Sequence, residues 1–251
     1  LRNLIRDLEN GGELIPEEIN NKKEEPSSPK GSSRHDELVD SFNKNYEEQN
    51  YEASLNIARQ LVDIKPTFQY YVMRGMANEA LKYYAKAIQD YREALRIEEN
   101  PLVLFQLSNV YSEIGSYSNS IEGVEKLINS YSSDWPFDLA TLYNNKAFAL
   151  LKLKRYEESS PWIDKALDLN KTLWYIWDTK GELEYQLGNY EDAITAMTKA
   201  NELNPHYNSL YYRGLSYIAI GKSQKGCMDL AKSSGMGNKE ADKAIELECD
   251  F

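Results

Sequence analysis

The sequence predicts an all-α solenoid of about six helix-turn-helix repeats, closed by a C-terminal capping helix. Three observations favour this fold class. Small or apolar residues recur in three columns with the same intervals of 33, 33, 39, 34 and 33 residues, a tyrosine recurs at a fixed place before one column, and apolar residues follow a spacing of three and four on both sides of a short break. Because such a helix pair cannot bury its own apolar face, we expect each pair to stack on its neighbours.

The columns mark equivalent places in successive repeats. The first column, which follows a tyrosine by three residues in five of its six members, is Ser54, Ala87, Ser120, Ser159, Ala193 and Gly226. The second is Phe42, Gly75, Ser108, Ala147, Gly181 and Gly214, and the third is Leu61, Ala94, Leu127, Ala166, Ala200 and Ser233. Helices that cross closely leave no room for long side chains, so small residues are expected at the crossing of each pair.

These columns predict the domain organisation. Six repeats are expected at residues 35–67, 68–100, 101–139, 140–173, 174–206 and 207–235. The run Gly235-Met236-Gly237-Asn238 then interrupts the repeats, and Ala241, Ala244, Ile245 and Leu247 give the next segment an apolar side. We therefore expect a capping helix in residues 236–251, because the last repeat of a solenoid must be shielded from water.

Residues 1–34 lack the repeat pattern and are predicted to form a short amphipathic helix followed by a flexible linker. Leu1, Leu4, Ile5 and Leu8 share one helical face, and residues 16–34 are rich in Pro, Ser, Glu and Lys. One interpretation is a remnant of an upstream region or of processing, since the sequence begins at Leu1. The alternative is that the apolar face docks in a groove of this molecule or a neighbouring one, which would allow self-association.

Charge and hydropathy narrow the class of partner. The sequence has 29 Lys and Arg against 40 Asp and Glu, a formal net charge of −11, which opposes binding to nucleic acid or an anionic membrane. No apolar run is long enough for a transmembrane segment. A cytoplasmic location is slightly favoured, and a periplasmic one is possible if an upstream signal has been removed.

The two cysteines, Cys227 and Cys249, have no spacing typical of a metal site. The favoured interpretation is a pair of small, half-buried apolar side chains in neighbouring helices. A single disulfide is the alternative.

Residues that could support catalysis are few. His35 and His206 are the only histidines, each is expected at a repeat boundary, and no nucleotide-binding, zinc-protease or serine-hydrolase motif is present. The sequence therefore predicts a protein that is not an enzyme and that binds no metal or cofactor.

The stretch from Trp177 to Pro205 resembles a tetratricopeptide repeat. It carries Gly181, Gly188, Tyr190, Ala193, Ala200 and a terminal Asn204-Pro205 in the pattern of that family, and the resemblance extends over residues 35–235. The resemblance implies a right-handed solenoid in which the first helix of each pair lines a concave groove. The closing segment around Gly226-Cys227-Met228 is similar to that of many bacterial repeat proteins, which hints at a bacterial source.

The resemblance places a partner-binding groove on the first helices. The groove positions are Asn43, Met76, Phe105, Asn109, Asn144, Phe148, Asp178, Glu182, Tyr185, Tyr211 and Leu215. Aromatic rings and amides suit an extended or helical peptide, and the acidic pair Asp178 and Glu182 would favour a neutral or basic segment. The alternative is that the rings mainly seal contacts between helices.

Two further features bear on the partner. The longer interval before the fourth repeat contains Trp135 and Phe137, which either form a loop contact with a partner or fill the gap between helix pairs. Family members that hold the acidic tails of chaperones use lysines where Val39, Val72 and Phe105 stand here, so a chaperone-tail receptor is not expected.

We therefore expect a protein-protein interaction scaffold that binds a peptide or protein segment in its groove. The alternative is a structural or assembly subunit of a bacterial envelope or secretion complex that self-associates through its ends or its N-terminal helix.

Overall fold

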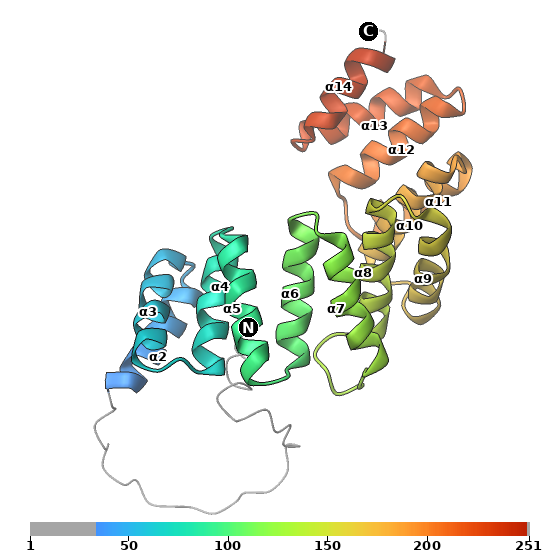
Figure 1. Cartoon of the computed structure of the whole chain (residues 1–251). Coiled ribbons are helices and arrows are strands. Elements are labelled where there is room, and N and C mark those ends of the chain that lie inside the picture. Colours follow the sequence, from blue (N-terminus) through green and yellow to red (C-terminus); the bar gives the residue numbers. More distant parts are fainter. Residues whose placement is uncertain (1–33, 250–251) are drawn as a thin grey trace, which may run out of the picture. The chain divides into compact units, whose positions relative to one another are not determined.

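The helical periodicity of the sequence is realised throughout the residues that the structure describes. In the computed structural model, which describes residues 34–249, these residues form thirteen α-helices and no β-strand (Figure 1). The predicted all-α repeat fold is confirmed for them. The helix and linker predicted for residues 1–34 lie outside the described range, apart from Arg34, which begins the first described helix.

The described helices fall into two units, and the first ends at Ile114. In this unit each helix packs against the next one along the sequence. Its helices are α2 (Arg34–Glu47), α3 (Tyr51–Ile64), α4 (Phe68–Ala80), α5 (Tyr84–Ile97) and α6 (Pro101–Glu113).

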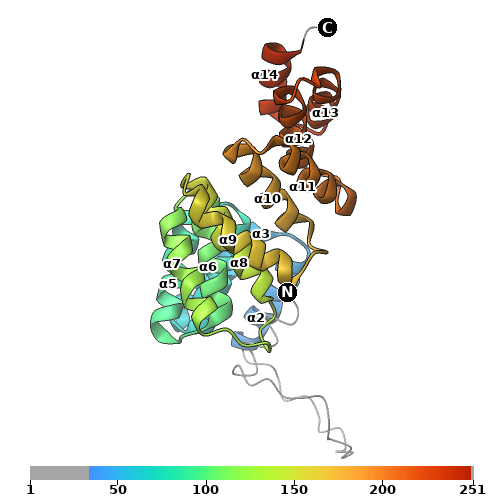
Figure 2. The same ribbon diagram turned by 90° about the vertical axis from the view of Figure 1, so that its right-hand side faces the viewer.

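The second unit begins at Gly115, inside the predicted third repeat. Helix α10 packs against α11 of its own pair and also touches α8 and α12, so the first helices of three successive pairs are neighbours (Figure 2). The helices of this unit are α7 (Tyr117–Asn129), α8 (Leu139–Lys152), α9 (Tyr156–Leu169), α10 (Trp174–Leu187), α11 (Tyr190–Leu203), α12 (Tyr207–Ala219), α13 (Ser223–Gly235) and α14 (Lys239–Glu248).

The first helices of the six predicted pairs are α2, α4, α6, α8, α10 and α12, and the helix that follows each one is the second helix of that pair. Polar caps determine where several of the first helices begin. Thr67 accepts a hydrogen bond from the backbone N–H of Tyr70 at the start of α4, and Asn100 and Asp138 cap α6 and α8 in the same way. A side-chain oxygen at this place satisfies a backbone donor that the helix itself leaves unpaired. The caps therefore set the register of the first helix in these pairs.

A residue with left-handed backbone ends each first helix. These residues have φ between 60° and 81° and repeat with the same intervals as the three sequence columns: Gln49, Lys82, Gly115, Lys154, Gly188 and Gly221. Left-handed backbone at this place stops the helix and reverses its direction toward the second helix. In the first five pairs the recurring tyrosine is the first residue of that second helix.

The predicted columns form the core of the pairs. All eighteen of their residues are buried, including Phe42, which stands where later repeats carry a small residue. Around them, Leu55, Met73 and Tyr91 are fully or almost fully buried in the first unit, as are Ile163 and Leu183 in the second. Close approach to the second helix of the same pair is seen at Gly75, Gly181 and Gly214, where an added Cβ would lie less than 3.0 Å from atoms of α5, α11 and α13.

Helix α14 covers the last pair and packs against α13 and α12. Ala241 and Ala244 are buried against Leu230, whereas Leu247 is 81% exposed despite its place in the predicted apolar set. This packing agrees with a capping helix.

A disulfide joins Cys227 of α13 to Cys249, which directly follows α14. The favoured sequence interpretation, two unbonded apolar cysteines, is therefore wrong, and the alternative of a single disulfide holds. The reason lies in the tertiary fold: α14 turns back on α13 and brings the two Cα atoms to 5.8 Å, a distance that a disulfide spans.

Candidate functional site

The predicted groove residues are divided between the two units. Those in the first unit are Asn43 on α2, Met76 on α4, and Phe105 and Asn109 on α6. Those in the second unit all lie on three neighbouring helices: Asn144 and Phe148 on α8, Asp178, Glu182 and Tyr185 on α10, and Tyr211 and Leu215 on α12. Seven of the eleven predicted groove residues therefore lie on three helices of the second unit, of which α10 contacts both α8 and α12.

Several predicted residues contribute to packing. Met76 is only 5% exposed and lies in a core cluster with Tyr91 and Val110. Asn144 is 6% exposed, and its side-chain oxygen, like that of Asn43, accepts no hydrogen bond in the structure. An amide oxygen of this kind could pair with a peptide N–H only after the side chain turns outward.

Glu182 connects three first helices at the centre of this set. Its carboxylate accepts hydrogen bonds from Lys152 of α8 and from the hydroxyl of Tyr212 of α12, the latter at 2.9 Å. Burial, followed by the nearby charge of Glu182, raises the pKa of the Tyr212 hydroxyl well above its ordinary value. The phenol therefore stays protonated and acts as a donor, which fixes the three helices relative to one another.

Asp178, one turn before Glu182, is also engaged within the protein. Its two oxygens accept hydrogen bonds from Asn208 at 2.6 Å and Ser209 at 2.7 Å, both on α12. Burial raises the pKa of the Asp178 carboxyl, and these hydrogen bonds partly offset the effect. The two predicted acidic residues therefore contribute to helix packing, in addition to any attraction they exert on a basic partner.

Aromatic rings run along the same three helices. The ring of Tyr185 lies 5.3 Å from that of Tyr212, which in turn lies 5.1 Å from that of Tyr211. On α8, the Lys152 ammonium lies 5.0 Å from the ring centre of Phe148. All four rings are partly exposed. We name this set, Phe148, Lys152, Glu182, Tyr185, Tyr211 and Tyr212, the α8–α10–α12 face.

The end of this face meets the capping helix. Tyr211 and Leu215, both predicted groove residues, pack against the cluster formed by Leu230, Ala241 and Ala244. These two side chains thus support α14.

The loop between α7 and α8 carries the other predicted contact. The rings of Trp135 and Phe137 lie 5.3 Å apart, and Trp135 also meets Tyr131 edge to face at 5.8 Å. Both predicted side chains are partly buried. The loop aromatics therefore pack on one another while keeping an exposed surface.

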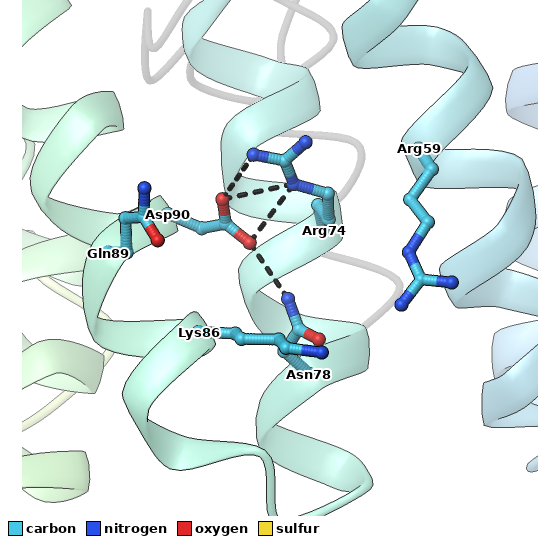
Figure 3. Close-up of a pocket in the computed structure, with 6 residues that line it drawn as sticks. All are labelled: Arg59, Arg74, Asn78, Lys86, Gln89 and Asp90. Carbon is cyan, nitrogen blue, oxygen red and sulfur yellow. Dashed lines mark hydrogen bonds and ion pairs between the residues drawn. The ribbon is translucent and has the colours of Figure 1, made fainter.

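A pocket in the first unit was not predicted. Figure 3 shows its lining residues, Arg59, Arg74, Asn78, Lys86, Gln89 and Asp90, on helices α3, α4 and α5. A signal for it exists in the sequence: Arg74 and Asp90 occupy the same two repeat columns as Arg213 and Asp229, and each pair is ion-paired.

The match to a known family follows the helix pairs. The sequence model described as "Tetratricopeptide repeat" matches residues 68–101, 140–173 and 174–207, each of which contains one first helix and the second helix after it. The chain is a tetratricopeptide repeat protein. Proteins of this family generally mediate protein-protein interactions and serve as scaffolds without catalytic activity.

Curated relatives are longer than this tetratricopeptide repeat protein. A TPR repeat-containing protein of Methanocaldococcus jannaschii is 27% identical over 208 residues, which is 80% of this chain and 36% of the relative. The Hsp70-Hsp90 organizing protein of Triticum aestivum is 28% identical over 203 residues, or 70% of this chain and 34% of the relative. The chain thus spans about a third of the length of these relatives.

Solved structures share the fold over most of the sequence. PilW, a type IV pilus biogenesis factor, gives a TM-score of 0.70 at 13% identity and covers 85% of this chain and 100% of PilW. PilF of Pseudomonas aeruginosa gives 0.66 at 15% identity, covering 84% of this chain and 96% of PilF. YrrB, described as a TPR protein with an unusual peptide-binding site, gives 0.52 at 17% identity, covering 75% of this chain and 97% of YrrB.

Both histidines have structural contacts in this tetratricopeptide repeat protein. His35 lies in the first turn of α2, not in a loop, and its ring meets that of Tyr70 edge to face. His206 caps α12 by accepting from the backbone N–H of Asn208. Within residues 34–249, no group of three or more His, Cys, Asp or Glu side chains is arranged to hold a metal ion, and no helix is long and apolar enough to cross a membrane.

Proposed function

We propose that the protein is a non-enzymatic scaffold and that the α8–α10–α12 face of the second unit holds a peptide or protein segment. The observation that carries the proposal is the row of partly exposed rings, Phe148, Tyr185 and Tyr211, on three adjacent first helices. Glu182 holds these helices in one arrangement through Lys152 and Tyr212. Rings on a rigid support give contact area at little entropic cost, which is typical of binding surfaces.

The chemistry of the face favours a neutral or basic segment. The Lys152 charge is compensated by Glu182, and the formal charge of the whole chain is −11, so an acidic segment would meet net repulsion. Tyrosine hydroxyls and the ring faces offer acceptors and π surfaces to Lys or Arg side chains of a partner. The described peptide-binding site of YrrB supports peptide recognition on this fold.

Affinity capture from the native organism tests this proposal. We expect a Phe148→Ala/Tyr185→Ala double variant to lose the partners that the wild-type protein retains. The matched control is Leu169→Ala/Met228→Ala, which removes two large side chains, each 56% exposed, from the second helices α9 and α13. Equal capture by both double variants, with both folded by circular dichroism, would reject the assignment of this face.

A second candidate function is supported by the disulfide. Disulfides persist in oxidising compartments such as the bacterial periplasm, so Cys227–Cys249 favours an envelope location over the cytoplasm. The pilus biogenesis factor PilW has a similar fold. We infer an alternative role as a structural or assembly subunit of an envelope complex, in which the protein associates with itself.

Light scattering separates the two functions. A self-associating subunit predicts a mass that rises with concentration and that falls to the monomer value when residues 1–30 are deleted, if the N-terminal segment mediates the contact. A monomer of constant mass that still captures partners would exclude the assembly role and leave the scaffold role.

A further inference from the structure

The pocket in the first unit lies between two second helices, with a first helix behind it. It has a volume of about 250 Å³, and its lining carries three cationic side chains, Arg59, Arg74 and Lys86, and one carboxylate, Asp90. A cluster with this excess of positive charge is unusual on a protein with a net charge of −11. Figure 3 shows Arg59 on α3, facing Arg74 and Asn78 of α4 across the pocket, and the Lys86 side chain extending from α5 past Asn78 toward Arg59.

A hydrogen-bonded network fixes the back wall of the pocket. Arg74 binds Asp90 with two guanidinium nitrogens at 2.6 and 3.0 Å, and the Asn78 amide nitrogen donates to the same carboxylate at 2.9 Å. Because a carboxylate only accepts, this contact determines which way the Asn78 amide points. Asn78 is 2% exposed, and its oxygen accepts no hydrogen bond in the structure. The wall therefore contains a buried acceptor that lacks a donor and has almost no accessible surface of its own.

The two outer cations are not neutralised within the described residues. Arg59 has a 3.3 Å contact with the Asn56 side-chain oxygen, and the Lys86 ammonium lies 5.3 Å from the ring centre of Tyr83. Among residues 34–249 neither takes part in an ion pair. Their charges remain available to an anionic group that enters between them.

The ion pair and the lysine of this pocket recur 139 residues later, on helices α12 and α13. Arg213 and Asp229 form the same ion pair at 2.7 Å, and Lys225 corresponds to Lys86. The place of Asn78 is taken by Tyr217, whose ring centre lies 5.9 Å from the Lys225 ammonium, and that of Arg59 by Thr198, which accepts from Arg213. The corresponding place on α11, α12 and α13 thus differs at three lining positions: Thr198 replaces Arg59, Tyr217 replaces Asn78 and Met228 replaces Gln89.

We propose that this pocket binds a peptide carboxylate, with Arg59 and Lys86 contacting the carboxylate oxygens in front of the wall formed by Arg74, Asn78 and Asp90. The volume is below the range of cofactor pockets and suits one acidic side chain or the C-terminus of a peptide. Inorganic phosphate would satisfy the same two cations and still carries a P–OH group at neutral pH, so it is the probe that separates a general anion site from a peptide site. The site is separate in residues and in charge preference from the α8–α10–α12 face, so either proposal can fail alone.

Nuclear magnetic resonance titration of the full-length protein tests the site. The probes are a short N-acetylated, C-amidated glycine peptide with one central glutamate, its glutamine counterpart, a glycine peptide with a free C-terminal carboxylate, and inorganic phosphate. We expect the Asn78 side-chain amide signal to shift with one or both carboxylate peptides, with an affinity that falls as salt rises. The stronger of the two identifies the source of the carboxylate.

Variants assign the effect to the pocket. Arg59→Gln/Lys86→Gln should weaken carboxylate binding about tenfold or more, whereas Lys225→Gln, the matched change in the last pair, should leave it unchanged. Asn78→Tyr, which copies the residue found in the last pair, should close the pocket, and the double variant tests the site even if Asn78→Tyr does not fold. The proposal is overturned if no probe shifts the Asn78 signal, if the glutamine and glutamate peptides bind equally without binding of the free carboxylate, if phosphate binds as tightly as the peptides, or if the double variant binds like the wild type.

Discussion

At the scale of single residues, two glycines of the last pair let the backbones of α12 and α13 approach each other closely. A Cβ atom on Gly226 would lie 2.6 Å from the carbonyl oxygen of Gly214, and one on Gly214 would lie 2.9 Å from that of Gly226. Gly181 is also crowded, but there the nearest atom, at 2.6 Å, belongs to the flexible side chain of Met197. A backbone carbonyl cannot move aside as a methionine side chain can, so an added Cβ should destabilise the protein more at Gly226 than at Gly181.

We expect Gly226→Ala to lower the free energy of unfolding by about 1–3 kcal/mol, as overpacking does, although alanine is the better helix former. Gly181→Ala should cost less. Gly235→Ala, in open space within the last turn of α13, should be neutral or stabilise by up to about 1 kcal/mol. Urea unfolding measures all three, and a Gly226→Ala protein as stable as Gly235→Ala would contradict the close approach.

The left-handed turn residues give a second prediction. Lys154 has φ of 60°, in a region that costs a residue with a side chain roughly 1–2 kcal/mol relative to glycine. We therefore expect Lys154→Gly to raise the free energy of unfolding by about 1 kcal/mol. The same change at the exposed Lys199 inside α11 should lower it by a similar amount. Thermal unfolding measures both variants. If Lys154→Gly and Lys199→Gly change the stability in the same direction, the turn at Lys154 is not left-handed.

Asp178 predicts a specific pH dependence. Its pKa is raised in the folded state by burial, so the folded protein holds this proton more tightly than the unfolded one does. Its contribution to stability is therefore greatest below the unfolded pKa and declines as the pH rises through the folded pKa. The difference in unfolding free energy between wild type and Asp178→Asn should favour the wild type more at about pH 4 than at pH 7. A difference that is constant between the two pH values would contradict a raised pKa.

At the scale of secondary-structure elements, α14 depends on a covalent link. It buries only Ala241 and Ala244 fully and leaves Leu247 in solvent, so its packing alone is modest. The disulfide closes a loop between residues 22 positions apart, for which the loss of conformational entropy predicts a stabilisation of about 3 kcal/mol.

We expect Cys227→Ser/Cys249→Ser to lower the unfolding free energy of the second unit by about that amount and to speed hydrogen exchange first in α14. Wild type measured with a reducing agent should behave like the variant. The bond does not form in solution if the free energy of unfolding of the wild type is the same with and without the reducing agent, and if both thiols react as free before it is added.

The positions of these elements could be predicted to different degrees. Helix pairs and crossing residues follow from local periodicity, so the columns through Gly75 and Ala87 can be assigned from the sequence alone. The Cys227–Cys249 bond could not be predicted, because it depends on how α14 turns back on α13. The internal partners of Glu182 lie 30 residues before and after it, a spacing set by the contact of successive first helices, which only the stacked helices reveal.

The candidate sites show the same limit. The groove positions follow from their place on the first helices, and seven of them lie on neighbouring helices of the second unit. The exposure of a side chain depends on the stacked neighbours instead, and Met76 and Asn144 are almost inaccessible. The pocket lined by Arg59 and Asn78 combines three helices, and only its Arg74–Asp90 pair, which recurs as Arg213–Asp229, leaves a signal in the sequence.

At the scale of the whole molecule, the protein is a series of helix pairs that bury their apolar faces on their neighbours, in two units that meet along the sequence at Gly115. In such a series the inner positions hold the structure and the outer positions of the first helices can vary with the partner. The family's general role as an interaction scaffold follows from this separation. We propose that within this series a partner is held on the α8–α10–α12 face.

Hydrogen-deuterium exchange of the full-length protein, alone and with a captured partner, tests this claim most directly. We predict that the partner slows exchange in α8, α10 and α12 and leaves α9, α11 and α13 unchanged, because only the first helices carry the exposed rings of the proposed face. Slower exchange confined to α9, α11 and α13, or no change in the second unit at saturating partner, would contradict it.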